Sequence, residues 1–495
     1  MKDCRAANVK HLLAFRLHML LGDDKPMLNG FYSALRCRGN VPHALSGRTA
    51  SVALWLAATG LATGLPAVAA TPMPVVSAVP YLADSGSVAV RCGRLIDGVA
   101  ARTQGPATVV IRSGRVDSVQ PGSVAPAGMP VVDLDEYTCL PGLIDMHTHL
   151  TDSGHETADL SVYYKRTPAE QGAIARESAR ATLLAGFTGA RDVGTYIAWV
   201  DRGLRDAINQ GEAVGPRMQV AGYYLTIPAG GGDLVIPGHA EAEIPPQVRM
   251  GVARGPEQFR QKAEQAVAGG ADFLKIIASG AVLAFGGVPG EREMLPEEIK
   301  AVVDVAHAHH KKVSAHAHGA QSIKDAILAG ADTIEHASLI DDEGIRLAKE
   351  HGVALSMDVY NGDWIDTVGR EEKWPEEFLR KNVETTEAQR QGFTRAHAAG
   401  VDIVYGTDAA VYPHGLNARQ FPIMVQRGMT PMETIQAATS LAARHMGWDD
   451  KIGSLQPGRY GDLIAVKGDP LADVTRLQDV AVVIKGGLVF KLPAE

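Results

Sequence analysis

Short apolar runs alternate with amphipathic stretches through the middle of the chain, between residues 141 and 450. A repeated cue separates them, in which a helical stretch ends, a glycine follows and an apolar run begins. The cue occurs at Gly186, Gly270, Gly330, Gly352 and Gly400. Glycine suits this place because the residue after a helix often takes a left-handed backbone conformation. The pattern predicts a series of helix-then-strand units.

The spacing of apolar residues places helices and strands within this region. Helices are expected at residues 169–184, 256–268, 296–309, 320–329 and 341–351. Strand ends are expected near His147, Arg191, Ala221, Lys275, His316, His336, Met357 and Asp408. Eight such units in about 300 residues predict an α/β fold, the (β/α)8 barrel of the TIM type, whose chemistry lies at the carboxyl ends of the strands. A doubly wound open sheet is the alternative. No GxGxxG motif follows the first strand, which argues against its nucleotide-binding form.

Short alternating strands, punctuated by proline and glycine, lie on both sides of the middle region. Residues 87–91 (SVAVR) and 108–111 (TVVI) precede it, and residues 462–466 (DLIAV) and 480–484 (VAVVI) follow it. We expect segments 83–140 and 452–495 to build one small β-sandwich domain together, next to a barrel at 141–451. Two unrelated caps are the alternative.

The first 70 residues have the form of a targeting segment. Residues 50–70 carry no charge, Arg48 precedes them, and small residues near Ala69 fit a cleavage site. We interpret residues 1–70 as an extension and a signal peptide, so the protein is expected to be exported, to the periplasm or outside the cell. A membrane anchor is the alternative, although Pro66 and the many small residues make a weak span.

Charge and cysteine content limit the classes of partner and of structural site that the sequence supports. The formal net charge is −8; eight Lys and Arg against three Asp give the first 49 residues +5, which leaves −13 for the rest. An acidic body gives no electrostatic reason to expect nucleic acid or an anionic membrane as a partner. The four cysteines show no CxxC spacing, which argues against a zinc knuckle or a disulfide framework. Whether Cys92 and Cys139 pair is left open by the sequence.

Residues of metal-binding type stand at several predicted strand ends. His147 and His149 are two apart, so on a strand they share one face and can share one metal ion. His316, His336 and Asp408 end three further strands. Each alone has an ordinary explanation, such as a solvated histidine or a helix-capping aspartate. Together at the ends of barrel strands they predict a metal centre.

Lys275 lies inside the apolar run of the fourth predicted strand. Its side chain could reach water along its stem. If it is buried instead, its pKa falls and the neutral amine can take up CO₂ to form a carbamate. The two carbamate oxygens could bridge two divalent ions, one held by His147, His149 and Asp408, the other by His316 and His336. Nitrogen and oxygen ligands suit Zn²⁺, with Mn, Co or Ni as substitutes.

These residues carry a family resemblance. The motif at residues 142–149 (GLIDMHTH), together with Lys275, His316, His336 and the GTD at 406–408, resembles the amidohydrolase superfamily. The closing stretch at 452–463 (IGSLQPGRYGDL) is similar as well. GFT at 186–188, RDV at 191–193, GPR at 215–217 and IEHA at 334–337 resemble its imidazolonepropionase-like branch. That branch includes Xaa-Pro dipeptidases, Lys/Arg-type carboxypeptidases and ochratoxin-hydrolysing amidohydrolases.

The resemblance implies a binuclear metal-dependent amidohydrolase or metallopeptidase. Its substrates would be small-molecule amides of a C-terminal amino acid: N-acyl amino acids, dipeptides, and ochratoxin A, giving ochratoxin alpha and phenylalanine. Asp408 would accept a proton from the attacking water and pass it to the leaving amine. The resemblance also implies a homo-oligomer, with an octamer as one form.

Substrate contacts are expected from the same strand ends. His318 shares the face of His316 and is expected to take part in catalysis by binding the substrate carbonyl or carboxylate, with support of a ligand as the alternative. Tyr223 or Tyr224, at the end of the third strand, could donate to the developing oxyanion, and Tyr223 is favoured. His414, in the loop after the last strand, is expected to contact the substrate.

Two other functions remain open alternatives. A cyclic-amide hydrolase of the imidazolonepropionase type would use a similar ligand set. A non-enzymatic barrel that has lost its metals is disfavoured by the complete set of ligands.

Arg191 and Asp192, on the second strand, are expected to form a structural pair.

Overall fold

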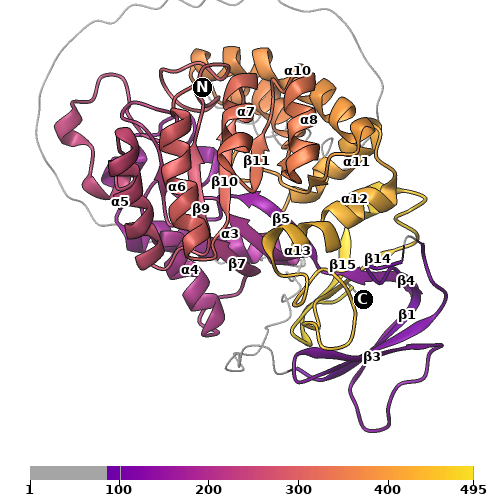
Figure 1. Ribbon diagram of the computed structural model, residues 1–495. Helices are drawn as coiled ribbons and strands as arrows, with labels where there is room; N and C mark the ends of the chain where they lie inside the picture. The colour runs from indigo at the N-terminus through magenta and orange to yellow at the C-terminus, as the bar shows by residue number, and fades with distance from the viewer. Residues whose placement is uncertain (1–85, 101, 494–495) are drawn as a thin grey trace, which may run out of the picture. The chain divides into compact units, whose positions relative to one another are not determined.

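The structure is a computed structural model that describes residues 86–100 and 102–493 (Figure 1). The extension and signal peptide predicted for residues 1–70 lie outside the described residues. Within the described ranges, no helix has both the length and the apolar character needed to cross a membrane.

Short parallel strands from the middle of the chain form the wall of a barrel. They are β5 (Leu143–Thr148), β6 (Phe187–Asp192), β7 (Arg217–Val220), β8 (Tyr224–Leu225), β9 (Leu274–Ile277), β10 (Val313–Ala317), β11 (Thr333–His336), β12 (Ala354–Ser356) and β13 (Ile403–Val404). Strands β5 to β7 pair as one arc and β8 to β13 as another. β7 and β8 are two pieces of the third barrel strand, separated at Gly222, whose φ of +83° interrupts the extended backbone.

Backbone hydrogen bonds join the two arcs into a closed wall. The Met146 amide donates to the Tyr405 carbonyl at 2.8 Å, which connects β5 to the end of β13. On the opposite side, the Asp272 amide donates to the Val220 carbonyl at 2.8 Å. The prediction of a TIM-type barrel is therefore confirmed, and the carboxyl ends of its strands meet at one mouth.

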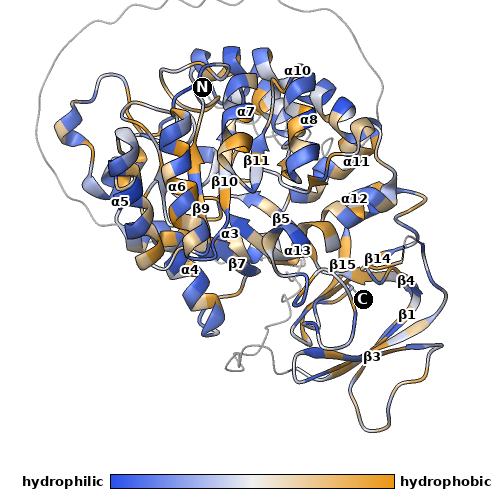
Figure 2. Cartoon of the chain, in the orientation of Figure 1, coloured by the Kyte–Doolittle hydropathy of each residue, from blue (hydrophilic) through white to orange (hydrophobic). Residues whose placement is uncertain are grey.

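Helices surround the barrel strands (Figure 1). They are α2 (Val162–Lys165), α3 (Pro168–Leu184), α4 (Val200–Asn209), α5 (Gly255–Ala268), α6 (Pro296–Ala308), α7 (Ala320–Ala329), α8 (Asp342–His351), α9 (Asn361–Trp364), α10 (Glu376–Ala399), α11 (Gln420–Gln426), α12 (Pro431–Ala437) and α13 (Ser440–Met446). Figure 2 shows apolar residues along inner strands such as β9 and β10 and polar residues on the outer helices. The five helices expected from the sequence are α3, α5, α6, α7 and α8, with ends that agree to within one residue.

The repeated glycine cue has the backbone conformation that its position predicts. All five glycines have positive φ, in the region that side chains disfavour. The values are +99° at Gly186, +94° at Gly270, +101° at Gly330, +66° at Gly352 and +76° at Gly400. Each glycine therefore ends a helix and turns the chain into the next strand.

Both ends of the described chain build a second, mixed sheet. Its strands are β1 (Val88–Leu95), β2 (Ala107–Arg112), β3 (Arg115–Pro121), β4 (Val131–Pro141), β14 (Leu463–Lys467), β15 (Val480–Lys485) and β16 (Leu488–Lys491). Their order is β16-β15-β14-β4-β1-β2-β3. In Figure 1 the indigo strands from the first segment lie beside the yellow strands from the last. The expected small β-sandwich thus takes the form of one continuous seven-stranded sheet.

The second sheet is tied directly to the barrel. β4 runs through Gly142 into β5, and a side chain at Gly142 would overlap the Thr188 side chain. Arg217 on β7 forms two hydrogen bonds with Asp462, at 2.7 and 2.9 Å, just before β14. The start of the first barrel strand is therefore fixed by the sheet that precedes it.

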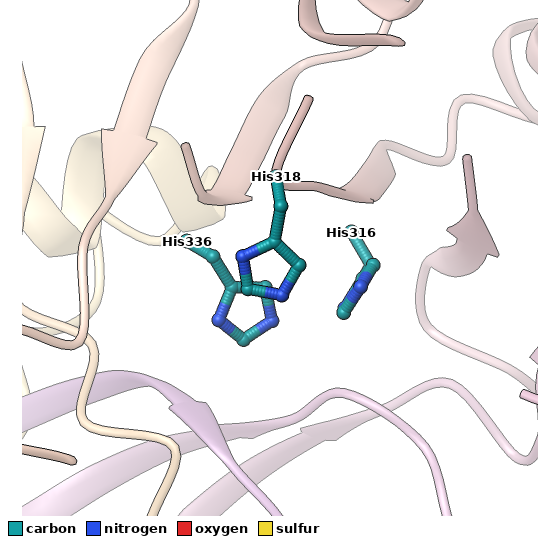
Figure 3. Close-up of side chains that lie close together, drawn as sticks. All are labelled: His316, His318 and His336. Atoms are coloured by element: carbon teal, nitrogen blue, oxygen red, sulfur yellow. The ribbon is translucent and has the colours of Figure 1, made fainter. Parts of the chain in front are cut away.

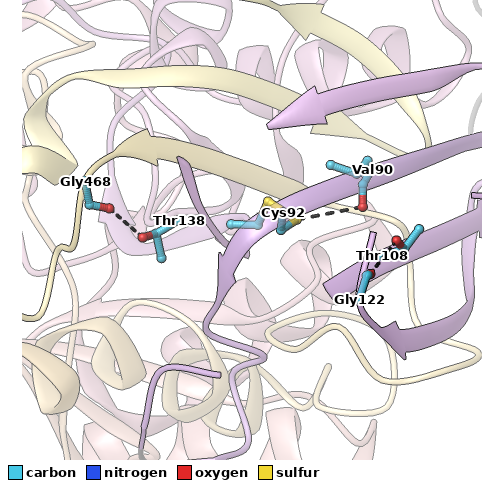
Figure 4. The surroundings of a disulfide bond; sticks show 7 residues. Val90, Cys92, Thr108, Gly122, Thr138 and Gly468 are labelled. Atoms are coloured by element: carbon cyan, nitrogen blue, oxygen red, sulfur yellow. Dashed lines mark hydrogen bonds between the residues drawn. A yellow bond between two sulfur atoms is a disulfide. The ribbon is translucent and has the colours of Figure 1, made fainter. Parts of the chain in front are cut away.

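Cys92 on β1 and Cys139 on β4 are joined by a disulfide bond between neighbouring parallel strands (Figure 4). Both residues are fully buried in the core of the second sheet. The pairing that the sequence left open is thus present, two residues before the chain enters Pro141 and the barrel.

Reduction of this disulfide is expected to destabilise the second sheet. The two cysteines are 47 residues apart in sequence. A disulfide that closes a loop of that length lowers the conformational entropy of the unfolded chain, which stabilises the folded protein by about 4 kcal/mol. The midpoint of thermal unfolding should fall both for the reduced protein and for the C92A/C139A variant. Reduction leaves the side-chain volume unchanged, so it separates the cross-link from the cavity that alanine creates. An unchanged midpoint after reduction would contradict the prediction.

Candidate metal centre

The first barrel strand brings two histidines to one carboxylate. His147 lies near the end of β5 and His149 just beyond it, and Asp408 follows β13. The His147 Nε2 and the His149 Nε2 lie 3.3 and 3.2 Å from the same Asp408 oxygen, Oδ1. The structure therefore brings together the three residues predicted to hold one ion.

A second group gathers at the ends of β10 and β11. His316, His318 and His336 lie with their rings 4.5 to 4.7 Å apart (Figure 3). One ligand atom from each lies within 4.8 Å of the others, and the same holds for His147, His336 and Asp408. His336 belongs to both groups, so the predicted ligands form one continuous cluster. His318 joins it as a further residue of ligand type.

Each ring of the cluster has one nitrogen engaged by a neighbouring group. The His149 Nδ1 donates to the Gly194 carbonyl at 2.7 Å, and the His316 Nε2 is 3.4 Å from the Gly280 carbonyl. The His318 Nδ1 lies 2.8 Å from the Ser338 hydroxyl. Such contacts fix the ring orientation and the tautomer, which leaves the other nitrogen available to a metal.

Two buried carboxylates orient the rings of His147 and His336. The His147 Nδ1 is 2.9 Å from Glu335 Oε2, and the His336 Nδ1 is 3.0 Å from Asp358 Oδ1. Glu335 also accepts from Arg191 at 2.6 Å. Both carboxylates hold the Nε2 of their histidine toward the cavity.

The partner of Arg191 differs from the prediction. Arg191 binds Glu335 and the Met146 carbonyl, whereas Asp192 accepts the amides of Leu150 and Gly194. Successive side chains on a strand point to opposite faces, so Arg191 and Asp192 cannot readily meet. The expected pair between them is wrong.

Lys275 is 2% exposed on β9 and lines the cavity beside the histidines. Burial, helped by nearby Arg191, outweighs the opposing pull of Glu335 and lowers the pKa of Lys275 to about 8. Among residues 86–100 and 102–493, its Nζ finds no hydrogen-bond partner. An unpaired buried amine amid ligand-type residues fits the predicted carbamate.

Burial and charge set the protonation of the cluster. Burial, together with neighbouring rings, places the pKa of His316 and of His318 well below the usual range, so both are neutral and able to bind a metal. Burial opposes ionisation of Asp408, but His147 and His149 outweigh it and hold the pKa of Asp408 well below its usual range. Ionised carboxylate and neutral imidazoles are the forms that coordinate divalent ions.

Two members of the cluster have strained backbones. The φ angle is +68° at His336 and +55° at Asp408, a region that non-glycine residues occupy at a cost of about 1–3 kcal/mol. The left-handed conformation at His336 interrupts strand alternation, so both Glu335 and His336 face the barrel axis. Strain of this kind concentrates at functional sites.

The cavity above the cluster has a polar floor and a largely apolar wall. Tyr163, Tyr196, Leu160, Ile277, Leu283 and Val411 are among the residues of that wall. Tyr224 lines the cavity, with its hydroxyl 3.1 Å from the His149 Nδ1 and 3.2 Å from the Gly194 carbonyl. His318 lines it as well. These two predicted substrate contacts therefore lie where a substrate can reach them.

Tyr223 and His414 lie elsewhere. The Tyr223 hydroxyl donates to the Lys262 carbonyl at 3.2 Å, and its ring packs on Trp199. The His414 Nε2 is 3.2 Å from the His149 carbonyl, so that ring supports the loop that carries His149. Neither lines the cavity. The predicted catalytic role of Tyr223 and the predicted substrate contact of His414 are wrong, because Gly222 redirects the strand and His414 turns under the loop.

Several residues of the site were missed from the sequence. Asp358 directly follows Met357, where the seventh strand is predicted to end, so its position at a strand end could have identified it as a site residue. Glu335 precedes His336, where strand alternation predicts an outward neighbour. Asn361 begins α9 and Asp152 lies in a loop, and only the fold brings them to the cavity. Burial raises the pKa of Asp152 to about 7.

The fold and the site together define a barrel hydrolase of the metal-binding type. A model of the amidohydrolase family matches residues 138–489. The chain therefore belongs to the amidohydrolase family and is a hydrolase that acts on amide bonds.

Known proteins with similar sequences or structures belong to the same superfamily branch. The chain is 32% identical to ochratoxinase of Aspergillus niger over 370 residues, 72% of this chain and 76% of that protein. It is 25% identical to an imidazolonepropionase of Deinococcus deserti over 382 residues, 74% and 87% of the two chains. A solved Xaa-Pro dipeptidase with methionine bound in its active site superposes with a TM-score of 0.77 at 34% identity, over 82% of this chain and all of that one. The A. niger ochratoxinase structure gives 0.73 at 28% identity, over 83% and 97%.

Removal of the Asp358 carboxylate is expected to weaken metal binding. Asp358→Asn keeps the size of the side chain but replaces an acceptor for the His336 Nδ1, so the affinity for Zn²⁺ should fall about 10- to 100-fold. Competition with a chelator of known affinity measures this. Asp342→Asn, at a carboxylate 92% exposed on α8, is the matched control. Equal affinities of the two variants would contradict the assigned role.

Proposed function

We propose that the protein is a binuclear metal-dependent amidohydrolase that cleaves the amide bond to a C-terminal amino acid. The observation that carries the proposal is the buried cluster of histidines with Asp408 and the unpaired Lys275 at the floor of the cavity. Similarity to ochratoxinase and to a Xaa-Pro dipeptidase supports this class of substrate. N-acyl amino acids, dipeptides and ochratoxin A, giving ochratoxin alpha and phenylalanine, are the proposed substrates.

Two divalent ions, Zn²⁺ in the first instance, are the proposed cofactors. His147, His149 and Asp408 would hold one, His316 and His336 the other, and Lys275 as a carbamate would bridge them. The unpaired Nζ of Lys275 and the neutral rings fit this arrangement. When bound, the ions would polarise the scissile carbonyl and lower the pKa of a water molecule towards about 7.

The protein's own side chains supply the rest of the reaction. Asp408 lies with Oδ1 against the histidines, so its Oδ2 can accept the proton of the attacking water and give it to the leaving nitrogen. The Tyr224 hydroxyl would donate to the oxyanion, and His318 would bind the carbonyl or carboxylate. The apolar wall holds the acyl part and excludes water from it.

Location and assembly are part of the proposal. Export to the periplasm or the exterior accords with the Cys92–Cys139 disulfide, because such bonds persist in oxidising compartments. After cleavage of the signal peptide, neither nucleic acid nor a membrane is proposed as a partner. A homo-oligomer is proposed from the family resemblance.

Loss of the bridging lysine should remove the binuclear site. Lys275→Ala is expected to lower the zinc content from two ions per chain to one or fewer, and most of the activity with it. With ¹³C-bicarbonate, a carbamate carbon signal should be seen for the wild type and be absent from the variant. Lys467→Ala, at a side chain 72% exposed, is the control and should keep both ions. Two ions in the Lys275→Ala protein would refute the bridge.

The substrate class can be tested with a panel. The zinc-loaded protein is expected to release the C-terminal amino acid from N-acyl amino acids, Xaa-Phe dipeptides or ochratoxin A, read by amino-acid analysis. Removal of the metal with a chelator should abolish release, and added Zn²⁺ should restore it. The alternative is a cyclic-amide hydrolase of the imidazolonepropionase type. Turnover of cyclic imides alone would favour it and overturn the proposal.

A further inference from the structure

The amide of Asn361 has a fixed orientation at the wall of the cavity. Asn361 opens α9, directly after the seventh barrel strand, and is 5% exposed. Its Nδ2 donates to Asp358 Oδ2 at 2.6 Å and to Asp408 Oδ2 at 3.1 Å. The reverse orientation would place the amide oxygen against two carboxylates, which have no proton to offer. The Asn361 Oδ1 must therefore point away from both.

This oxygen is an acceptor without a donor. The Asn361 Oδ1 is buried and has no hydrogen-bond partner anywhere in the described part of the chain, although Asn361 lines the cavity. Asn382, in the same wall, differs in this respect. Its Nδ2 donates to the Gly362 carbonyl and its Oδ1 accepts from the Thr386 hydroxyl, both at 3.0 Å. Buried polar atoms are nearly always paired, and because Asn361 lines the cavity, a ligand bound there can supply the donor that its oxygen lacks.

The position of this acceptor identifies the donor. In the proposed function, Asp408 delivers a proton to the leaving nitrogen, so that nitrogen must lie beside the Asp408 carboxylate. Asn361 binds the Asp408 oxygen that faces away from the histidines. The free Asn361 oxygen is thus next to the place of the leaving nitrogen. A secondary amide has one hydrogen on that nitrogen, whereas a tertiary amide has none.

We propose that the Asn361 Oδ1 accepts the N–H of the scissile bond and makes the protein selective for secondary amides. The inference rests on the proposed function and narrows its substrate class. Water adds its oxygen to the carbonyl carbon, the C–N bond breaks, and the nitrogen keeps its hydrogen and gains one proton through Asp408, which yields a primary amine. Amides of proline or of N-methyl amino acids leave the Asn361 oxygen unpaired and are poor substrates.

A matched pair of substrates tests this selectivity. N-benzoyl-phenylalanine and its N-methyl analogue differ only at the amide nitrogen. For the wild-type protein, kcat/KM is expected to favour the secondary amide by about 10- to 100-fold, since a site built around a substrate N–H rejects the analogue that lacks it. Because the methyl group also adds bulk, the wild-type ratio alone does not separate the hydrogen bond from steric exclusion.

Variants of Asn361 make that separation. Asn361→Leu keeps the side-chain volume but removes the acceptor. The ratio of kcat/KM for the secondary amide to kcat/KM for its N-methyl analogue should therefore fall about tenfold, mainly because kcat/KM for the secondary amide falls. Asn361→Asp keeps an oxygen at the same place, but its second oxygen faces Asp358 and Asp408, so one of the three carboxyl groups must take up a proton. Both rates should therefore change while the preference is retained. Asn382→Leu is the control: whatever it does to the two rates, their ratio should stay at the wild-type value.

The outcomes distinguish this inference from the proposed function. Turnover of both substrates at equal kcat/KM by the wild type overturns the inference and leaves the proposed function standing. A wild-type ratio that persists in Asn361→Leu shows steric exclusion and also overturns it. If Asn361→Leu does not fold, loss of the preference in Asn361→Asp overturns it instead. No turnover of any N-acyl amino acid overturns the proposed function, and the inference with it.

Discussion

The carboxylate of Glu335 is the buried charge on which the centre of the barrel depends. It accepts from Arg191 at 2.6 Å, from Ser314 at 2.7 Å and from Thr333 at 2.8 Å, and lies 2.9 Å from the His147 Nδ1. Burial opposes its ionisation, but Arg191 and His147 outweigh it and hold the pKa of Glu335 well below its usual range. Strands β5, β6 and β10 are thereby linked to β11. Without this carboxylate Arg191 would carry an uncompensated buried charge, which is strongly destabilising.

Above this carboxylate, polar groups are packed more closely than their own hydrogen bonds can satisfy. Neutral rings at His316 and His318, the unpaired amine of Lys275 and strained backbone at His336 all surround one small volume. Burial without partners is costly, and a divalent ion would relieve it by accepting several lone pairs at once. The unpaired oxygen of Asn361 is a similar case in the wall of the cavity. A substrate N–H would supply its missing partner, as a metal ion would for the ligand atoms at the cavity floor.

Strand alternation and strand-end position were enough to predict which residues converge on the centre. His147, His149, Lys275, His316, His336 and Asp408 lie around one cavity floor. The same reasoning failed where the backbone leaves the extended conformation. Gly222, at +83°, directs Tyr224 and not Tyr223 into the cavity, and the +68° at His336 turns it inward beside Glu335. Neither angle can be predicted from the sequence. Residues other than glycine rarely adopt a positive φ, and glycine adopts positive and negative φ about equally well.

The sequence by itself determined the barrel, the ends of five of its helices and the ligand-type residues, because periodicity and glycine placement are local properties. It also limited the chemistry, since a lysine within an apolar strand must be neutralised or paired if it is buried. Only the tertiary structure decided which groups orient those ligands. Glu335 meets an arginine 144 positions away, Asp358 reaches His336, and Asn361 reaches Asp408 from 47 positions away. Such pairings depend on closure of the barrel, which brings residues far apart in the sequence into contact.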